Sequence, residues 1–258
     1  MSKSEKEWFE EWFDDTYLLL YRHRDQAEAE RLVHWLAGQV ENRLKDRRVI
    51  DLGCGAGRHA RSMSELGWDV TGIDLSCPML RQAIQADTRI PGDKTKHPVC
   101  YVRADLRRLP FSDMSFSIAL NAFTSFGYFR SDAEHKQAFQ EFARVLKHGG
   151  VLILDLLNPE TALRDLVPHD VVEEGSMKAV QTRQYNPVER RIEKHVRITH
   201  PSGESRDILE SVRLFTLDEI SELAKFASFD ELSWFGDYEG GSFDSSRSER
   251  MIMLAWKR

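Results

Sequence analysis

The stretch Arg48-Val49-Ile50-Asp51-Leu52-Gly53-Cys54-Gly55-Ala56-Gly57 decides the fold class of this 258-residue chain. It indicates a short apolar strand that ends in an acidic residue and runs into a glycine loop, with a helix beginning at about Arg58. Glycine accepts positive φ and has no Cβ, so a ligand can lie directly against the backbone of such a loop. A strand, a tight glycine loop and a helix N-terminus in succession are how α/β sheets hold nucleotide-like ligands.

The spacing of the glycines distinguishes this loop from two other nucleotide-binding loops. A dinucleotide-binding loop, G-x-G-x-x-G/A, needs a small residue at position 58, where the sequence has Arg58. The third glycine comes one residue earlier, at Gly57. No lysine follows as it does in a P-loop, which excludes that class of phosphate site. An ordinary tight turn between a strand and a helix is the alternative that the downstream sequence must exclude.

Two more predicted strands are followed by acidic residues. Residues 68–74 form the second predicted strand, and Asp74 lies 23 residues after Asp51. This is close to the spacing of about 20 residues at which a carboxylate accepts hydrogen bonds from ribose hydroxyls. Residues 98–104 form the third, and Asp105 follows it. Acidic side chains therefore recur at the carboxyl ends of the strands, where doubly wound sheets bind ligands.

With these motifs the sequence resembles the class I S-adenosylmethionine-dependent methyltransferases. D-L-G-C-G-A-G is similar to their first motif, G-I-D-L-S to their second and R-A-D-L to their third, and R-V-L-K-x-G-G-x-L is typical of the approach to their fifth strand. The resemblance covers roughly residues 30–160. It implies a Rossmann-like, doubly wound α/β sheet of seven strands with an antiparallel last strand. It also implies S-adenosyl-L-methionine as cofactor and S-adenosyl-L-homocysteine as product.

The resemblance implies a set of cofactor contacts. Asp74 would bind the ribose, the Asp105 carboxylate would accept from the adenine 6-amino group, and the Leu106 N–H would donate to a ring nitrogen. An N-terminal tyrosine would reach the cofactor or the acceptor, with Tyr21 as the first candidate and Tyr17 behind it. The expected cofactor-binding residues are Asp51, Gly53, Gly55, Gly57, Asp74, Leu75, Met79, Asp105, Leu106, Asn121 and Tyr21.

The methyl acceptor is expected beyond the predicted fourth strand, residues 116–120. Asn121 ends that strand, and A-F-T-S-F-G-Y-F continues past it with aromatic and hydroxyl side chains. The N-P-P-[YF] or D-P-P-Y run of enzymes that methylate amino groups of DNA or protein is absent. The segment is instead similar to bacterial small-molecule methyltransferases, including amino-sugar N-methyltransferases. Phe123, Phe126 and Tyr128 are the expected substrate contacts, with packing in the core as the alternative for each.

Methyl transfer by in-line displacement at a sulfonium mainly needs alignment, because the donor is already activated. Proximity and desolvation can supply roughly 7–11 kcal/mol of the barrier. A general base is needed only if the acceptor is protonated. The sequence does not single one out among His59, Tyr128 and His195, so no catalytic residue is predicted.

The chain is expected to be a methyltransferase core with two additions. Residues 1–45 are predicted to form an N-terminal helical cap, 46–160 the S-adenosylmethionine-binding core, 161–215 an inserted antiparallel sheet, and 216–258 the last helix and strands. Three segments of alternating polarity, 177–186, 190–200 and 205–215, carry the inserted sheet. This sheet would shape the acceptor pocket or form the contact of a homodimer.

Composition limits the class of protein and its partners. Apolar residues make up 41% and charged residues 30%, as in ordinary globular proteins, and no apolar run approaches the roughly 18 residues of a membrane span. A net charge of −6 gives no global basic field for nucleic acid. Three scattered cysteines without a C-x-x-C pair predict no metal site and a reducing compartment. With no apolar signal region, a cytoplasmic location is expected.

The sequence leaves three functions to be distinguished. The favoured one is a methyltransferase acting on a small-molecule amine or hydroxyl, with an RNA substrate as an alternative that the acidic balance disfavours. The second is a methyltransferase fold that binds or regulates without turnover, against which the intact glycines and acidic residues argue. The third is an NAD-linked oxidoreductase, against which Arg58 and the predicted antiparallel last strand argue.

Overall fold

The computed structural model describes residues 7–21, 26–87 and 98–258, and its main sheet has the predicted doubly wound topology. Seven strands lie in the order β3-β2-β1-β4-β5-β11-β10. The first five pair in parallel, whereas β11 runs antiparallel to both β5 and β10. Their bounds are β1 Arg48–Leu52, β2 Asp69–Asp74, β3 Cys100–Arg103, β4 Phe116–Asn121, β5 Leu146–Leu157, β10 Phe229–Phe235 and β11 Arg250–Lys257.

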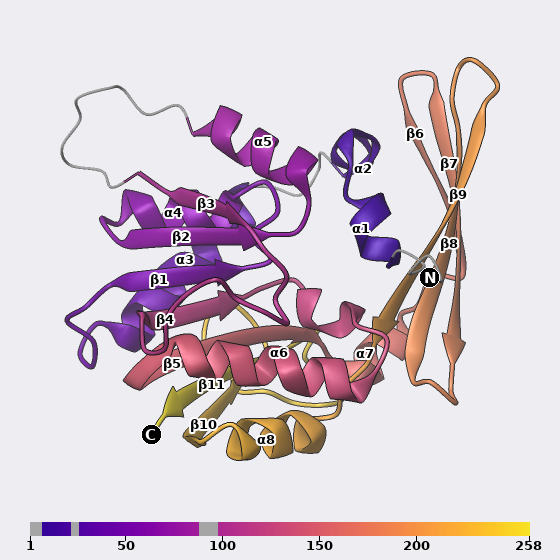
Figure 1. Ribbon diagram of the computed structural model, residues 1–258. Coiled ribbons are helices and arrows are strands. Elements are labelled where there is room, and N and C mark those ends of the chain that lie inside the picture. The colour runs from indigo at the N-terminus through magenta and orange to yellow at the C-terminus, as the bar shows by residue number, and fades with distance from the viewer. Residues whose placement is uncertain (1–6, 22–25, 88–97) are drawn as a thin grey trace, which may run out of the picture.

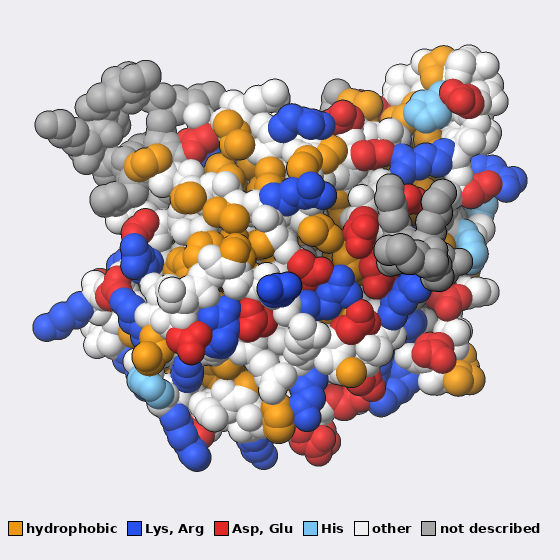
Figure 2. Space-filling model, viewed as in Figure 1, with side chains coloured by type: hydrophobic (Ala, Val, Ile, Leu, Met, Phe, Trp, Pro, Cys, Tyr) orange, Lys and Arg blue, Asp and Glu red, His pale blue; other side chains and the backbone are white. Residues whose placement is uncertain are grey.

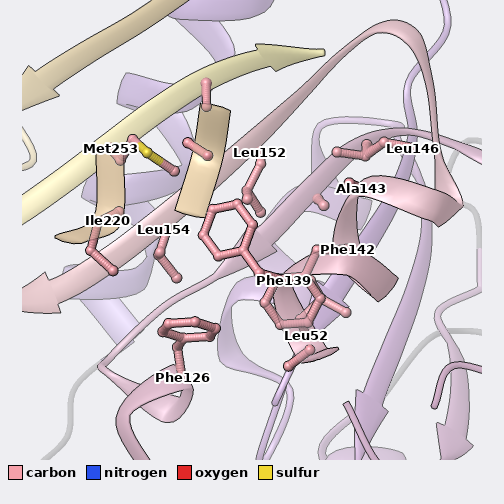
Figure 3. Close-up of a cluster of buried hydrophobic side chains, with 14 of the residues drawn as sticks. Leu52, Phe126, Phe139, Phe142, Ala143, Leu146, Leu152, Leu154, Ile220 and Met253 are labelled. Atoms are coloured by element: carbon pink, nitrogen blue, oxygen red, sulfur yellow. The ribbon is translucent and has the colours of Figure 1, made fainter. Parts of the chain in front are cut away.

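Helices cover both faces of this sheet (Figure 1). Helices α6 (Asp132–Val145) and α8 (Leu217–Phe226) pack on one face, and α3 (Gln26–Val40) and α4 (Arg58–Glu65) pack on the other. Along β1, Ile50 and Leu52 face the first layer and Val49 faces the second, so the strand is buried on both sides, as parallel strands usually are. Figure 3 shows the first layer, where Phe139 and Phe142 meet Leu152 and Leu154. α5 (Cys77–Ala86) lies beside β2 and β3.

A second, antiparallel sheet follows the fifth strand. It consists of β6 (His169–Glu174), β7 (Met177–Asn186), β8 (Arg191–Thr199) and β9 (Ser205–Arg213), paired in chain order. The alternating polarity of the sequence predicted the last three of these strands but not β6, which follows α7 (Pro159–Arg164). This edge strand is half exposed and mostly polar, so its apolar pattern is weak.

Two short N-terminal helices pack against the second sheet. The helices are α1 (Trp8–Trp12) and α2 (Asp15–Leu20), and Asp14 caps α2 by accepting from the backbone N–H groups of Thr16 and Tyr17. Buried side chains of both helices meet buried side chains of β7 and β8: Trp12, Tyr17, Leu20, Met177, Ala179, Val196 and Ile198. Figure 1 shows α1 and α2 between the two sheets, at the carboxyl ends of the parallel strands. α3, which lies within the residues 1–45 predicted as a cap, packs with the core layer instead.

No helix within the described ranges is both long and apolar enough to cross a membrane. In the same ranges, no three His, Cys, Asp or Glu side chains are grouped so that they could hold a metal ion.

Candidate functional site

A cleft of about 610 Å³ lies where β1, β2, β3 and β4 end, and α1 and α2 form its other wall. Figure 2 shows hydrophobic side chains gathered on the face that carries α5 and the neighbouring N-terminal helices. Helices α1, α2, α4 and α5, strand β2 and the segments that follow β1, β3 and β4 supply the lining: Phe9, Phe13, Asp15, Tyr17, Leu18, Leu19, Tyr21, Gly53, Cys54, Gly55, Ala56, Arg58, His59, Arg61, Asp74, Leu75, Met79, Gln82, Ala104, Asp105, Leu106, Ala122, Phe123, Ser125, Tyr128 and Phe129.

The glycine loop forms one wall of the cleft with its bare backbone. Gly53, Gly55 and Gly57 have φ values of +77°, +54° and +75°, a region in which side chains other than glycine are strained. Gly53 and Gly55 line the cleft. A Cβ on Gly55 would meet no protein atom within 4 Å, so only a ligand would fill that space. Gly57 lies outside the lining, and a Cβ there would be 2.4 Å from the Tyr101 hydroxyl.

Two carboxylates adjoin the glycine loop. Asp74 lines the cleft and accepts hydrogen bonds from the backbone N–H groups of Gly55 and Ser76, each at 2.8 Å. Each carboxylate oxygen has a second lone pair that can accept from a ligand hydroxyl. Asp51 is 1% exposed, and its Oδ2 has no partner among the described residues. Burial and repulsion from Asp74 raise the pKa of Asp51 to about 7.

These groups fit S-adenosylmethionine, which carries a sulfonium and an ammonium group. A buried carboxylate oxygen without a partner is costly, and a cation or a hydrogen-bond donor nearby would relieve that cost. Asp51 and Asp74 place two carboxyl groups beside the glycine backbone. The donor set therefore suits a ligand with positive charge and hydroxyl groups.

The predicted adenine end has a feature that the sequence did not reveal. The Asp105 carboxylate lines the cleft but is already paired with Arg107, with an Nη2–Oδ2 distance of 2.6 Å. Arg107 also donates to Glu134 and pairs with Glu7, which immediately precedes α1. Burial opposes ionisation of Asp105, but Arg107 outweighs it, and the pKa of Asp105 lies below its usual range. Leu75, Met79 and Leu106 also line the cleft.

Aromatic side chains of the N-terminal helices form the opposite wall. Phe13 stacks on Tyr128 with ring centroids 5.7 Å apart and meets Tyr17 edge-on at 4.8 Å. Phe9 and Phe13 line the cleft, whereas Trp12 is buried against the second sheet.

Tyr21 lines the cleft, and its hydroxyl oxygen accepts a hydrogen bond from a side chain of the second sheet. The Lys194 ammonium donates to the Tyr21 oxygen and, at 3.1 Å, to Glu210. Glu210 also accepts from the indole N–H of Trp12. The inserted sheet thus reaches the cleft wall through Lys194.

The three expected substrate residues lie in different places. Phe123 and Tyr128 line the cleft. Phe126 does not, because it points into the core between α6 and the sheet, 5.7 Å from the ring of Phe139 and 5.4 Å from that of Phe215 (Figure 3). Phe126 therefore has the core position that was the alternative expected for it.

Asn121, an expected cofactor residue, is also outside the lining. It is fully buried, and its side-chain amide donates to the Leu52 carbonyl at 2.6 Å. It therefore ties the end of β4 to the end of β1, immediately before the glycine loop.

His59 stands out among the three candidate bases. It lines the cleft, it is 5% exposed, and its Nε2 has no partner among the described residues. Burial, with help from the charge of Arg58, lowers the pKa of His59 to about 3, so the ring is neutral at physiological pH. Tyr128 also lines the cleft, whereas His195 is exposed on β8.

Comparison with known proteins agrees with this geometry. Residues 50–154 match a family model described as a methyltransferase domain. These residues form a class I S-adenosylmethionine-dependent methyltransferase domain. The domain holds the glycine loop, Asp74, Asp105 and Phe123, and S-adenosylmethionine is the methyl donor of this family.

Curated relatives match parts of the chain. The putative methyltransferase YqeM of Bacillus subtilis is 31% identical over 109 residues, 42% of each chain. A dTDP-3-amino-3,4,6-trideoxy-alpha-D-glucopyranose N,N-dimethyltransferase of Streptomyces venezuelae is 29% identical over 209 residues, 79% of this chain and 82% of its own length. The chain spans 42% to 55% of the length of the first four curated relatives that it matches.

Solved structures extend the likeness to the whole fold. The sugar N-methyltransferase KedS8 from Streptoalloteichus superimposes with a TM-score of 0.71 at 22% identity, covering 100% of this chain and 99% of its own. The segments outside residues 50–154, including the N-terminal helices and the second sheet, therefore also have counterparts in a solved structure.

Proposed function

We propose that the chain transfers a methyl group from S-adenosylmethionine to an amine or hydroxyl group of a small molecule. One observation carries this proposal: the bare glycine backbone, the Asp74 carboxylate and the aromatic wall of Phe13 and Tyr128 line the same cleft. One side offers contacts for a nucleoside with positive charge, and the other offers flat apolar surface for an acceptor.

The residues divide between cofactor and acceptor. Gly53 and Gly55 would lie against the amino-acid part of the cofactor, and Asp74 would accept from its ribose hydroxyls. Leu75, Met79, Asp105 and Leu106 would surround the adenine. Tyr21 would bind the cofactor or the acceptor, and Phe123 and Tyr128 would contact the acceptor. Asp51 does not line the cleft, but its negative charge would attract the positively charged cofactor across the glycine loop.

The bound cofactor supplies an activated methyl group, so the protein mainly has to align the acceptor and exclude water. The aromatic side chains of α1 and α2 line the cleft at the strand ends, where they would exclude water from the reacting atoms. Alignment and desolvation of this kind are worth roughly 7–11 kcal/mol. With a pKa lowered to about 3, the His59 ring is too weak a base to take a proton from an ammonium acceptor.

An amine acceptor is favoured over a hydroxyl. Aromatic faces attract cationic groups, and the Asp15 carboxylate lines the same side of the cleft. The Streptomyces venezuelae relative is named for methylation of an amino nitrogen, which supports the same choice. A homodimer through the second sheet remains a prediction that light scattering would check.

The test begins with calorimetric titration of the purified protein with S-adenosylmethionine, S-adenosylhomocysteine and NAD. Micromolar binding of the two adenosyl compounds and no binding of NAD are expected. Methyl transfer to glycine, ethanolamine and glucosamine is then measured against matched compounds that carry only hydroxyl groups. Absence of binding of either adenosyl compound would overturn the proposal. Binding without any transfer would favour a regulatory protein.

A further inference from the structure

The backbone at the end of β4 has an unusual conformation. Phe123 and Thr124 are consecutive residues with φ values of +57° and +66°. Neither is glycine, and Thr is β-branched, for which the left-handed region is strongly disfavoured. Such strain persists only where the surrounding structure over-determines it, and it gathers at functional sites.

Asp155 of β5 holds this turn. Its side chain is fully buried, and its Oδ2 accepts from the Phe123 N–H at 2.8 Å. Its backbone carbonyl accepts from the Thr124 N–H at 3.0 Å. Both strained residues are therefore bound by one residue of the neighbouring strand.

Two side chains from the C-terminal part of the chain complete the network. The Arg250 guanidinium donates to Asp155 Oδ1 at 2.7 Å and to the Thr124 hydroxyl at 3.2 Å. The Tyr238 hydroxyl donates to Asp155 Oδ2 at 2.9 Å. A buried carboxylate that balances a cation in this way tolerates little displacement, because any shift leaves a charge unpaired.

The network fixes one ring of the cleft. Phe123 lines the cleft, while Asp155 does not. The Arg58 guanidinium lies 5.1 Å and the Arg250 guanidinium 5.7 Å from the centroid of the Phe123 ring, and the ring of His59 lies 5.5 Å away. The ring is therefore placed by its backbone turn and by cations that flank it.

We propose that Asp155 is a positioning residue for methyl transfer: it holds Phe123 in the strained turn that sets the acceptor wall of the cleft. The inference rests on the proposed function, because it assigns Phe123 a role toward the acceptor. Asp155 acts only through Phe123 and Thr124 and touches no ligand. β11 and the loop after β10 thereby help to shape a site that the first four strands form.

The main test is Asp155→Asn, which keeps the side-chain shape but removes the charge and one acceptor. We expect kcat for methylation of glycine, ethanolamine or glucosamine to fall by about 10- to 100-fold, as a misplaced contact does. The Kd of S-adenosylhomocysteine should stay within about twofold, since the cofactor contacts lie elsewhere. Hydrogen exchange of the Phe123 and Thr124 amides should become faster.

Three further variants keep the result interpretable. Tyr238→Phe removes one donor and leaves both backbone contacts, so its effect should be much smaller than that of Asp155→Asn. Thr124→Gly in the Asp155→Asn background makes the left-handed turn easier to adopt, and it should restore part of kcat. Thr124→Val removes only the contact with Arg250. It is the substitute test if the Asp155→Asn protein does not fold. Its kcat should then fall while its Kd for S-adenosylhomocysteine is kept.

Failure of this proposal differs from failure of the proposed function. If the wild type methylates one of the probes and Asp155→Asn, or its Thr124→Val substitute, does so with unchanged kcat, the positioning role is overturned. If the wild type methylates none of them, the proposed function fails first, and the role of Asp155 in catalysis fails with it.

Discussion

The carboxylate of Asp74 accepts a hydrogen bond from the backbone N–H of Gly55 at 2.8 Å. The end of the second strand and the glycine loop after the first are therefore one unit, although 18 residues separate them in the sequence. A ligand bound to one of them is also bound beside the other.

Gly55→Ala should reduce cofactor affinity with little effect on the stability of the fold. The φ of +54° makes alanine strained by about 1–2 kcal/mol, but its Cβ would meet no protein atom. We therefore expect a folded protein whose affinity for S-adenosylhomocysteine falls far more than its stability. Thermal unfolding and calorimetric titration measure the two effects. Gly38→Ala, within α3 and also free of steric contact, is the matched control and should leave binding unchanged.

Asp74→Asn should weaken cofactor binding by about 1–3 kcal/mol, the free energy lost when a hydroxyl loses its acceptor. Asparagine keeps one acceptor oxygen, so the turn at Ser76 can persist, whereas alanine would release both backbone contacts. The Kd of S-adenosylhomocysteine, titrated against both variants, measures the loss. An unchanged Kd would contradict the ribose assignment.

The pKa of about 7 at Asp51 predicts a pH dependence of binding. The charged form of Asp51 attracts a cationic ligand, so affinity for S-adenosylmethionine should rise as pH increases from about 6 to 8. Binding near pH 7 should release protons, which titrations in buffers of different ionisation enthalpy detect. Asp51→Asn should remove both effects.

The same group affects the stability of the ligand-free protein in the opposite direction. Because the folded-state pKa of Asp51 lies above the unfolded value of about 3.9, its contribution to stability is present below pH 4 and is lost as pH rises through 7. Wild type should therefore lose stability relative to Asp51→Asn between pH 4 and 7. If the free energy of unfolding changes with pH in the same way for the two proteins over that range, the pKa of Asp51 is not raised.

Phe126 and Phe13 should respond differently to truncation. Phe126→Ala removes a fully buried ring from the core and should destabilise the protein by about 3–5 kcal/mol. Phe13→Ala opens the cleft wall, so its main effect should be a higher KM for the acceptor. Denaturant unfolding and steady-state kinetics on both variants measure these effects. A large KM change with little loss of stability in Phe126→Ala would return that ring to the acceptor site.

Features formed by residues close together in the sequence could be predicted from local sequence patterns. The glycine loop and the doubly wound sheet follow from strand and loop patterns within a few dozen residues, and the structure agrees with them. Phe123, Phe126 and Tyr128 come from one aromatic run, and a 3-10 helix over Ser125–Tyr128 turns Phe126 toward the core and Tyr128 toward the cleft. Alternation cannot reveal such a turn in advance.

Contacts between distant segments were not predictable in the same way. In the sequence Asp155 is only a polar interruption in an apolar strand, because its partners Tyr238 and Arg250 lie 83 and 95 residues later. Lys194 meets Tyr21 across 173 residues. Only the packing of the second sheet and of β11 brings these groups to the cleft.

The place of β11 between β5 and β10 also has a consequence for biosynthesis. The apolar edge of β5 is complete at Leu157, but its partner begins only at Arg250. At about 5–20 residues per second, a ribosome needs roughly 5–20 s to make the intervening chain. During that interval an open, aggregation-prone strand edge faces the cell, while the second sheet can already pair from neighbouring strands. Ribosome-bound chains stalled before Arg250 should therefore be sensitive to protease in β5 and should recruit chaperones.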